Sequence, residues 1–286
     1  RIIANAGAAF DHSDGDWTRR GLASVRVEQE VKEGLTLGLG LMGSFANNDL
    51  PTFEDSSISD QSLQLNGYVK ADLAKNLRAG AFLGFGRAWY DFDLHQTGFD
   101  LSGKMVGKRH LYGAMLSGDV EVGRVLVTTD VILSRATEDL DQAKLTGSAG
   151  DETRKVLFAV GEVDMTRLSV PVSGEFRIWG DDHEGWNSTL RLSPGLLCED
   201  SSADSSSLIC GYQFGGRLTA KRSGSGAAYL DYRIEAVDDR TRNLIGIGYA
   251  DTFGPRRNIE WAFDVSGGMS DDRADSRAMF HLRARQ

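Results

Sequence analysis

The sequence predicts an all-β protein, a closed antiparallel transmembrane β-barrel of about 12 to 14 strands with short periplasmic turns and longer extracellular loops. Three observations lead to this fold class. Apolar residues recur at every second position, glycine is abundant while proline is scarce, and short and long connections alternate along the chain. No Pro/Ser-rich linker or block of charge divides the chain, so residues 1–286 are expected to form a single outer-membrane β-barrel domain.

Composition supports a large sheet. The chain has 286 residues, of which 34 are Gly and 4 are Pro. Typical usage is roughly 7% Gly and 5% Pro. Proline removes a donor from a hydrogen-bonded ladder, whereas glycine tolerates tight bends and close backbone approach, so an extensive antiparallel sheet explains both deviations. No apolar run reaches the length of about 18 residues that a membrane-spanning helix needs, but a barrel strand needs only alternate apolar residues.

The first strands show two distinct faces. In residues 35–45, apolar side chains such as Leu39 alternate with small or weakly polar ones, and in residues 63–73 the face opposite Leu65 is hydrophilic. A strand that separates lipid from water needs this pattern of one apolar and one wettable face. The same alternation recurs in residues 77–85, 112–121, 125–134, 170–178, 228–235, 260–266 and 280–285.

The connections between these strands alternate in length, as they do in outer-membrane barrels. Short turns are expected at residues 32–34, 74–76, 123–124, 181–185, 222–226 and 254–256. Longer polar loops are expected at residues 11–19, 46–60, 95–107, 137–154, 199–207 and 268–274. The count from Ile3 is about 14 strands if residues 156–180 form one long strand emerging from a loop, and about 12 if residues 228–253 are not a membrane hairpin.

A soluble β-sandwich would also show alternation. Two features favour the barrel. The second face repeatedly carries Gly and Ser rather than the Lys, Glu and Thr of a solvated sandwich face, and closure of the sheet removes the edges that so long a sheet would otherwise have to protect.

The polar face is expected to line the lumen with charges of both signs. The lumen-lining residues predicted are Arg26, Glu28, Lys70, Asp72, Arg78, Asp119, Glu121, Asp130, Glu175, Arg177, Arg191, Asp231, Arg233, Glu235, Glu260 and Asp264. Salt-bridged walls of this kind would not select strongly by charge. Leu39 and Leu65 are expected to face acyl chains, where Arg should cost roughly 2 to 4 kcal/mol, whereas Arg at Gln64 or Asn66 should be nearly neutral.

Aromatic residues gather near the ends of the expected strands, where girdles at the two membrane interfaces would place them. The residues concerned are Trp17, Trp89, Trp179, Trp186, Trp261, Tyr90, Tyr112, Tyr229, Tyr232 and Tyr249. The alternative is ordinary core packing of these rings.

The two cysteines, Cys198 and Cys210, flank a polar stretch between two expected strands, at residues 187–197 and 209–220. An oxidising compartment beyond the inner membrane would join them in a disulfide at the outer mouth. Closing this loop would remove on the order of 3 kcal/mol of unfolded-state entropy. Two unpaired thiols in a reduced cytosolic protein are the competing interpretation.

The sequence indicates no enzyme and no cofactor. The 5 His residues are scattered without an H-x-x-x-H pair, G-x-S-x-G does not occur, and the Gly pairs lie within strands rather than at a strand-to-helix turn. The acidic pieces around Asp14 and Asp272 are expected to be solvated loops rather than metal sites. A net charge of -9 and the absence of a basic stripe argue against nucleic-acid binding.

Three segments resemble the C-terminal translocator barrel of type V autotransporters, particularly the alphaproteobacterial kind. They are RHLYGAMLSGDVEVGRVLVTTDVILSRATEDL at 109–140, RLSVPVSGEFRI at 167–178 and FDVSGGMSDDRADSRAMFHLR at 263–283. The resemblance implies a barrel of 12 strands in the outer membrane of a Gram-negative bacterium, through whose lumen an N-terminal passenger reaches the cell surface.

The partners that follow from this resemblance are outer-membrane lipid, the passenger segment and the outer-membrane barrel assembly machinery. Two other functions stay open on the sequence alone. One is a porin-like channel or solute transporter without a passenger, and the other is a soluble β-rich binding protein.

Overall fold

Nearly all of the described residues lie in β-strands. The computed structural model describes residues 1–13, 16–50, 56–149, 152–159, 161–180, 185–202, 208–222, 226–238, 240–253, 258–270 and 273–284. The strands are β1 (Ile2–Ser13), β2 (Asp16–Lys32), β3 (Leu35–Leu50), β4 (Ser56–Ala74), β5 (Leu77–Gln96), β6 (Phe99–Val122), β7 (Val125–Leu140), β8 (Ala143–Ala149), β9 (Glu152–Phe158), β10 (Gly161–Trp179), β11 (Trp186–Ser201), β12 (Ile209–Arg222), β13 (Ala227–Val237), β14 (Arg240–Phe253), β15 (Ile259–Ser270) and β16 (Arg273–Ala284).

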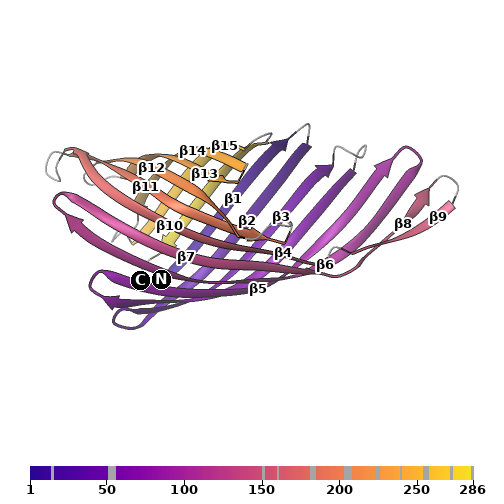
Figure 1. Ribbon diagram of the computed structural model, residues 1–286, viewed down its shortest axis with the longest axis horizontal. Helices are drawn as coiled ribbons and strands as arrows, with labels where there is room; N and C mark the ends of the chain where they lie inside the picture. Colours follow the sequence, from indigo (N-terminus) through magenta and orange to yellow (C-terminus); the bar gives the residue numbers. More distant parts are fainter. Residues whose placement is uncertain are drawn as a thin grey trace.

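Fourteen of these strands, all except β8 and β9, close into one antiparallel barrel. Each pairs with the next along the chain, β7 pairs with β10, and β1 closes the ring by pairing with β16 from Ile2↔Ala284 to Ser13↔Arg273. Figure 1 shows the oblique strands around the barrel wall and both termini side by side at one end. The closed ring confirms the predicted fold class and excludes the β-sandwich.

The strand count settles two expectations. β13 and β14 pair from Ala227↔Ala250 to Val237↔Arg240, so residues 228–253 do form a hairpin of the barrel. The count of about 14 is therefore confirmed, and the 12 strands implied by the family resemblance are wrong for this chain.

Strands extend well beyond the length that a membrane requires. β5 has 20 residues and β6 has 24, and they pair without interruption as far as Gln96↔Phe99. The expectation of a polar loop at 95–107 is therefore wrong. A tilted strand crosses the hydrocarbon layer in about 9–11 residues, so the polar sequence beyond that length continues as a paired hairpin that extends past the bilayer. The stretches 11–19, 137–154 and 268–274 are likewise strand over much of their described length.

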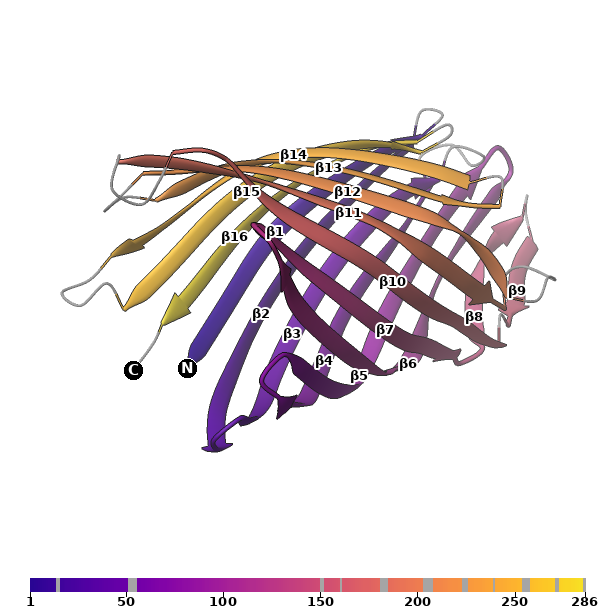
Figure 2. The same cartoon turned by 60° about the vertical axis from the view of Figure 1, so that its left-hand side comes forward.

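The prediction of one long strand over 156–180 is wrong in detail. Val156–Phe158 belongs to β9, which forms a hairpin with β8, and β10 begins at Gly161, where φ is 83°. β8 pairs with β6 beyond the end of β7, from Phe99↔Ala149 to Lys104↔Lys144. The β8–β9 hairpin therefore extends one side of the wall at the end opposite the termini, as Figures 1 and 2 both show. Because β8 and β9 lie outside the ring and β7 pairs directly with β10, the barrel keeps its even count of 14 strands.

A small apolar core anchors this hairpin. It consists of Phe92, Leu101, Met105, Ala143 and Leu145, with Leu101 only 1% exposed. The first three lie on β5 and β6 and the last two on β8, so burial of these side chains holds the hairpin against the barrel wall.

The turns at the end that carries the termini are short. Two-residue connections at 33–34, 75–76 and 123–124 confirm three of the predicted turns, and Gly34 and Gly123 supply the positive φ values of 73° and 64° that such turns need. The predicted turns at 181–185, 222–226 and 254–256, and the centres of the loops at 46–60 and 199–207, lie wholly or mainly outside the described residues.

Candidate functional site

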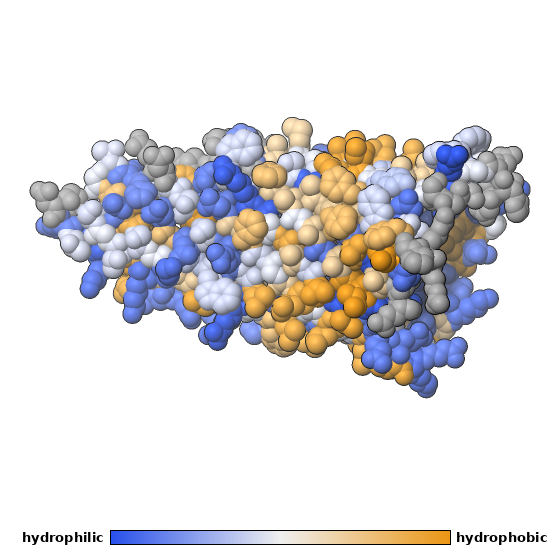
Figure 3. All heavy atoms as spheres, turned by 180° about the vertical axis from the view of Figure 1, so that it is seen from behind, coloured by the Kyte–Doolittle hydropathy of each residue, from blue (hydrophilic) through white to orange (hydrophobic). Residues whose placement is uncertain are grey.

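The outer wall of the barrel is apolar. Leu39 is 59% exposed and Leu65 is 49% exposed, whereas Gln64, the residue directly before Leu65 on β4, is 8% exposed. Figure 3 shows hydrophobic residues across the middle of the wall, with hydrophilic residues gathered toward both ends. An apolar band between polar rims is the surface that a membrane barrel presents to lipid.

The aromatic residues divide between the two faces. Outward-facing rings such as Trp89, Tyr112 and Tyr232 are exposed, as girdle residues would be. Tyr90 and Tyr229 are exceptions, because their side chains contact charged residues of the inner face, Glu138 and Arg217 respectively. The expectation that these two belong to a girdle is wrong, since each lies one position out of step with the exposed apolar residues of its strand.

The inner face carries the predicted wall residues. Each occupies a strand position that alternates with an outward-facing apolar side chain. What the sequence could not specify is the partner of each charge, because that partner depends on the register between strands. The structure groups these side chains into several networks at successive levels of the lumen.

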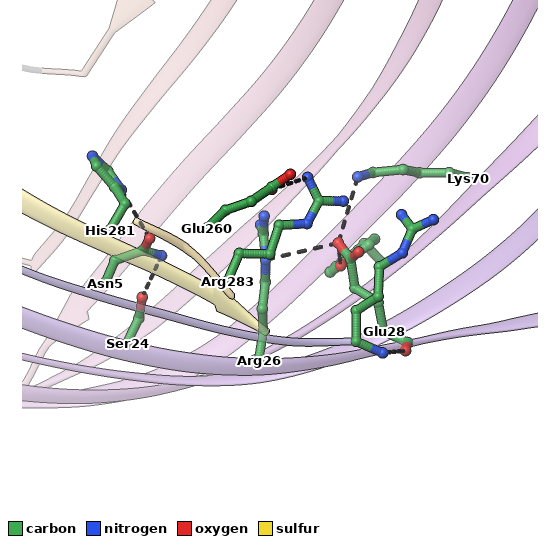
Figure 4. A network of polar contacts seen from close by, with 10 residues as sticks. Asn5, Ser24, Arg26, Glu28, Lys70, Glu260, His281 and Arg283 are labelled. Atoms are coloured by element: carbon green, nitrogen blue, oxygen red, sulfur yellow. Dashed lines mark hydrogen bonds and ion pairs between the residues drawn. The ribbon is translucent and has the colours of Figure 1, made fainter. Parts of the chain in front are cut away.

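The first network lies near the termini and centres on Glu28, a carboxylate that is 6% exposed (Figure 4). The hydroxyl of Tyr68 donates a hydrogen bond to Glu28 Oε1. Lys70 Nζ lies 3.7 Å from the same oxygen and Arg26 Nε lies 3.8 Å from it. A buried carboxylate is tolerated only when its charge is compensated in this way.

The same network continues across the closure of the barrel. Asn5 Nδ2 donates to Ser24 Oγ over 3.1 Å, and Asn5 Oδ1 lies 2.9 Å from His281 Nδ1. His281 Nε2 lies 3.0 Å from Asp264 Oδ2. These contacts join β1, β2, β15 and β16, so they couple the first strands to the last ones. Nearby, Arg283 and Glu260 form an ion pair at 3.7 Å.

Farther along the wall, a bidentate ion pair joins β12 and β13. Arg217 donates two hydrogen bonds to Asp231, of 2.5 and 2.8 Å, and its guanidinium lies 4.6 Å from the centre of the Tyr229 ring. Bidentate pairing fixes the guanidinium in one orientation. On β5 and β6, Arg78 and Asp119 pair at 3.1 Å.

A third network, toward the end opposite the termini, has members on four strands, β10, β11, β13 and β14. Arg167 on β10 lies 2.9 Å from Glu235 on β13 and 3.6 Å from Glu199 on β11, and Arg240 on β14 lies 3.7 Å from Glu199. Arg233 completes it at 4.0 Å from Glu235. Each carboxylate therefore serves two arginines.

Sequence reasoning missed several members of these networks. Arg109 contacts Tyr90 at 2.8 Å and Glu138 at 3.0 Å, and the Tyr90 hydroxyl donates to Glu138 over 2.5 Å. These residues lie in strand extensions, or beside stretches that were expected to be loops. The stretches GRAWYDF at 86–92 and MVGKRHL at 105–111 do not alternate apolar with polar residues, so the sequence carried no clear signal of these contacts.

Other predicted wall residues are not brought together. Asp72, Glu121, Asp130 and Glu175 form no ion pair with another residue in the described part of the chain. Arg191 donates to Ser173 over 3.1 Å rather than to its register partner Glu175.

The disulfide is confirmed. Cys198 and Cys210 are directly opposite in the register of β11 and β12, and an S–S bond joins them. The pair lies one step inside the end of the β11–β12 ladder, which closes with Glu199↔Ile209, so the bond fixes this end of the strand pair and the connection beyond it. By alternation Cys198 shares the face of the exposed Leu196, two residues before it, but Cys198 itself is only 2% exposed.

The described residues contain neither a metal-binding cluster nor a membrane-spanning helix. They contain no group of three or more His, Cys, Asp or Glu side chains that could hold a metal ion. In the same ranges, no helix is long and apolar enough to cross a membrane.

Comparisons with solved structures identify the fold. The chain superposes on the translocator domain of the autotransporter NalP from Neisseria meningitidis with a TM-score of 0.66 and 12% identity, covering 100% of this chain and 88% of that one. The β domain of the Bordetella autotransporter BrkA gives a TM-score of 0.59 and 10% identity, with 99% and 98% coverage.

Similar values come from a different class of protein. The toluene transporter TodX of Pseudomonas putida gives a TM-score of 0.62 and 10% identity, with 99% of this chain and 89% of that one covered. The sequence matches no protein-family model and no curated protein. The chain therefore has the closed antiparallel barrel fold that autotransporter translocator domains share with aromatic-hydrocarbon transporters.

Proposed function

We propose that the chain is the outer-membrane translocator of an autotransporter-like protein, and that it passes an N-terminal passenger to the surface of a Gram-negative cell. The observation that carries the proposal is a closed 14-stranded barrel with an apolar outer band and an inner wall of paired charges. Closure gives each of the 14 barrel strands a paired neighbour on both sides, so the ring presents no open sheet edge to lipid. The proposal assigns the chain no catalytic role.

The inner wall suits an extended polypeptide of any composition. Ion pairs such as Arg217–Asp231 and Arg167–Glu235 place opposite charges side by side at several levels. A wall of compensated charges solvates a passing peptide group without retaining acidic or basic side chains. Strong selection by sequence would work against export of a long chain.

The first strand begins at the rim where a passenger would enter. The amino group of Arg1 donates to the backbone oxygen of Glu28 over 2.7 Å, and the Glu28 amide donates to the Arg1 oxygen over 2.9 Å. A passenger joined ahead of Arg1 would therefore start beside Glu28 and its network at this rim. Outer-membrane lipid and the barrel assembly machinery are the further partners that this role requires.

A reporter peptide with a protease site, fused ahead of Arg1 behind a secretion signal, tests the proposal in a Gram-negative host. Protease added to intact cells should cleave the reporter. Gly215 and Gly216 provide matched variants, because they are neighbours on opposite faces of β12, and a side chain added at either meets only Ser193 or Leu192 at 3.5 Å or more. Gly215→Trp should obstruct the lumen and reduce surface cleavage, whereas Gly216→Trp should not.

Heat-modifiable migration on gels verifies that each variant has folded. A folded wild-type barrel that leaves the reporter in the periplasm would overturn the proposal. Equal surface cleavage in the two tryptophan variants would exclude the lumen as the route.

A solute channel is the second candidate, because the lumen contains cavities of small-molecule size. One of about 300 Å³ lies against β1, β2 and β13–β16, and another of about 590 Å³ lies near the termini. The likeness to the toluene transporter TodX supports the same candidate. In this case the barrel without any passenger should admit small solutes into lipid vesicles, and Gly215→Trp should slow their entry while Gly216→Trp leaves it unchanged.

A further inference from the structure

Two cationic side chains lie on the lipid-facing side of the barrel. Arg87 alternates on β5 with Phe85 and Trp89, which are both exposed large apolar side chains, so all three point out of the wall. The ring of His110 on β6 meets the Phe85 ring edge-on, with 5.6 Å between the ring centres, so His110 shares this face. Lys108 lies two positions before His110 on the same strand and therefore points outward as well.

The register of the sheet places the two cations directly opposite each other, as Arg87↔Lys108. Residues in such positions have Cβ atoms about 5 Å apart, and like charges there destabilise a sheet. The other residues around Arg87 on this face of β4 and β6 are Gln61, Leu63, Leu65, Val106 and His110. None of them is acidic, and Arg87 makes no ion pair with any residue in the described part of the chain.

Lys108 is only weakly compensated. Its ammonium nitrogen lies 3.9 Å from Asp141 Oδ1, and the two side chains are 49% and 58% exposed. Exposed pairs of this kind contribute little to stability. Asp139 lies opposite Lys108 on its other side, on β7. Lys108 can therefore turn toward Arg87 with little loss of free energy.

Both cations lie where the hydrocarbon layer ends. Arg87 is the eleventh residue of β5 counted from Leu77, which follows a short turn at the end that carries the termini. A tilted strand crosses the hydrocarbon in about 9–11 residues. Leu83 and Phe85, just before Arg87 on this face, are 50% and 56% exposed and belong to the apolar band. The cations therefore lie at the headgroup level of the leaflet opposite the termini, which is the outer leaflet if the short turns are periplasmic.

A phosphate group matches this position. A guanidinium binds phosphate oxygens through two parallel hydrogen bonds, and an ammonium group binds them as a point charge. A phosphate between Arg87 and Lys108 would replace a repulsion with two attractions. A lipid carries its phosphate at this level of the membrane, and its acyl chains would lie along the exposed ring of Phe85.

We infer that Arg87 and Lys108 hold the phosphate of an outer-leaflet lipid, with an acyl chain against Phe85. The inference rests on the proposed placement of the barrel in the outer membrane and not on export of a passenger. A barrel that binds the lipid without exporting the reporter would therefore refute the export proposal alone.

The test is native mass spectrometry of the folded full chain in non-ionic detergent, with lipid A that carries two phosphates as the probe. Lipid A from which both phosphates have been removed keeps the acyl chains, and inorganic phosphate keeps only the charge. Lipid A should bind saturably, and both controls at least about tenfold more weakly, because each lacks one of the two interactions.

Variants locate the site. Arg87→Gln should weaken lipid A binding about tenfold or more, and Arg87→Lys, which keeps the charge, should lose less. Arg78→Gln is the matched control, because Arg78 lies on the same strand but on the inner face, where it pairs with Asp119 at 3.1 Å. Heat-modifiable migration shows that each variant is folded.

Three results would overturn the inference. They are the absence of saturable lipid A binding, equal binding of lipid A with and without its phosphates, and equal losses in the Arg87 and Arg78 glutamine variants. Inorganic phosphate that binds as tightly as lipid A would refute the lipid character of the ligand.

Discussion

The ring of Tyr68 lies directly over Gly38, its partner in the register of β3 and β4, and its hydroxyl reaches across to Glu28 on β2. A Cβ atom at Gly38 would overlap the Tyr68 ring. The absence of a side chain at one position thus allows a tyrosine to span three strands and compensate a buried carboxylate.

Gly38→Ala should destabilise the barrel by about 1–3 kcal/mol, the usual effect of overpacking, because Tyr68 must move away from Glu28. Urea unfolding in lipid vesicles measures the change. Gly67→Ala is the control, since nothing lies within 4 Å of a Cβ added at that position. Equal effects of the two substitutions would show that the contact between Tyr68 and Gly38 contributes nothing.

Removal of the disulfide should lower the free energy of unfolding by about 3 kcal/mol, the entropy of closing a loop of 12 positions. Cys198→Ser together with Cys210→Ser, compared with the wild type before and after reduction, provides the measurement. Thiol labelling of the unfolded, unreduced protein should find no reactive thiol. Two labelled thiols per chain would refute the bond.

Leu39→Arg and Leu65→Arg should each cost roughly 2–4 kcal/mol in lipid if they lie near the midplane, because both side chains point out of the barrel. The structure changes the choice of control. Gln64 is 8% exposed and hydrogen-bonds to Asn66, so Arg at either position would disturb a packed pair. Gly215→Arg, on the inner face with space around it, should be tolerated instead. Similar losses for Leu39→Arg and Gly215→Arg would contradict the assignment of faces.

Asp231→Asn should leave the Arg217 charge uncompensated and shift ion permeability toward chloride, whereas Arg217→Gln should shift it toward potassium. The reversal potential of the barrel in a planar bilayer under a KCl gradient measures both shifts. Exchanging the two residues should bring the potential back toward the wild-type value. Shifts of the same sign in both single variants would show that the pair does not border the conducting path.

The sequence by itself determined the all-β class, the alternation that separates Leu39 from the polar face, the approximate number of strands and the Cys198–Cys210 pairing. These features are local: a period of two follows from strand geometry, and the cysteines are close in the chain. Strand ends were less predictable. Polar residues at 95–107 suit a loop and a strand extension equally well, and only long-range pairing distinguishes the two.

Tertiary structure alone decided which charges meet. The contacts of Arg167 with Glu235 and of His281 with Asn5 join residues on strands whose relative position depends on closure and register. The β8–β9 hairpin depends likewise on its pairing with β6 and on burial of Leu101 and Leu145. A shift of one residue between two strands would exchange inner and outer faces while leaving each strand's own pattern unchanged, so the sequence of a single strand carries no record of its partners.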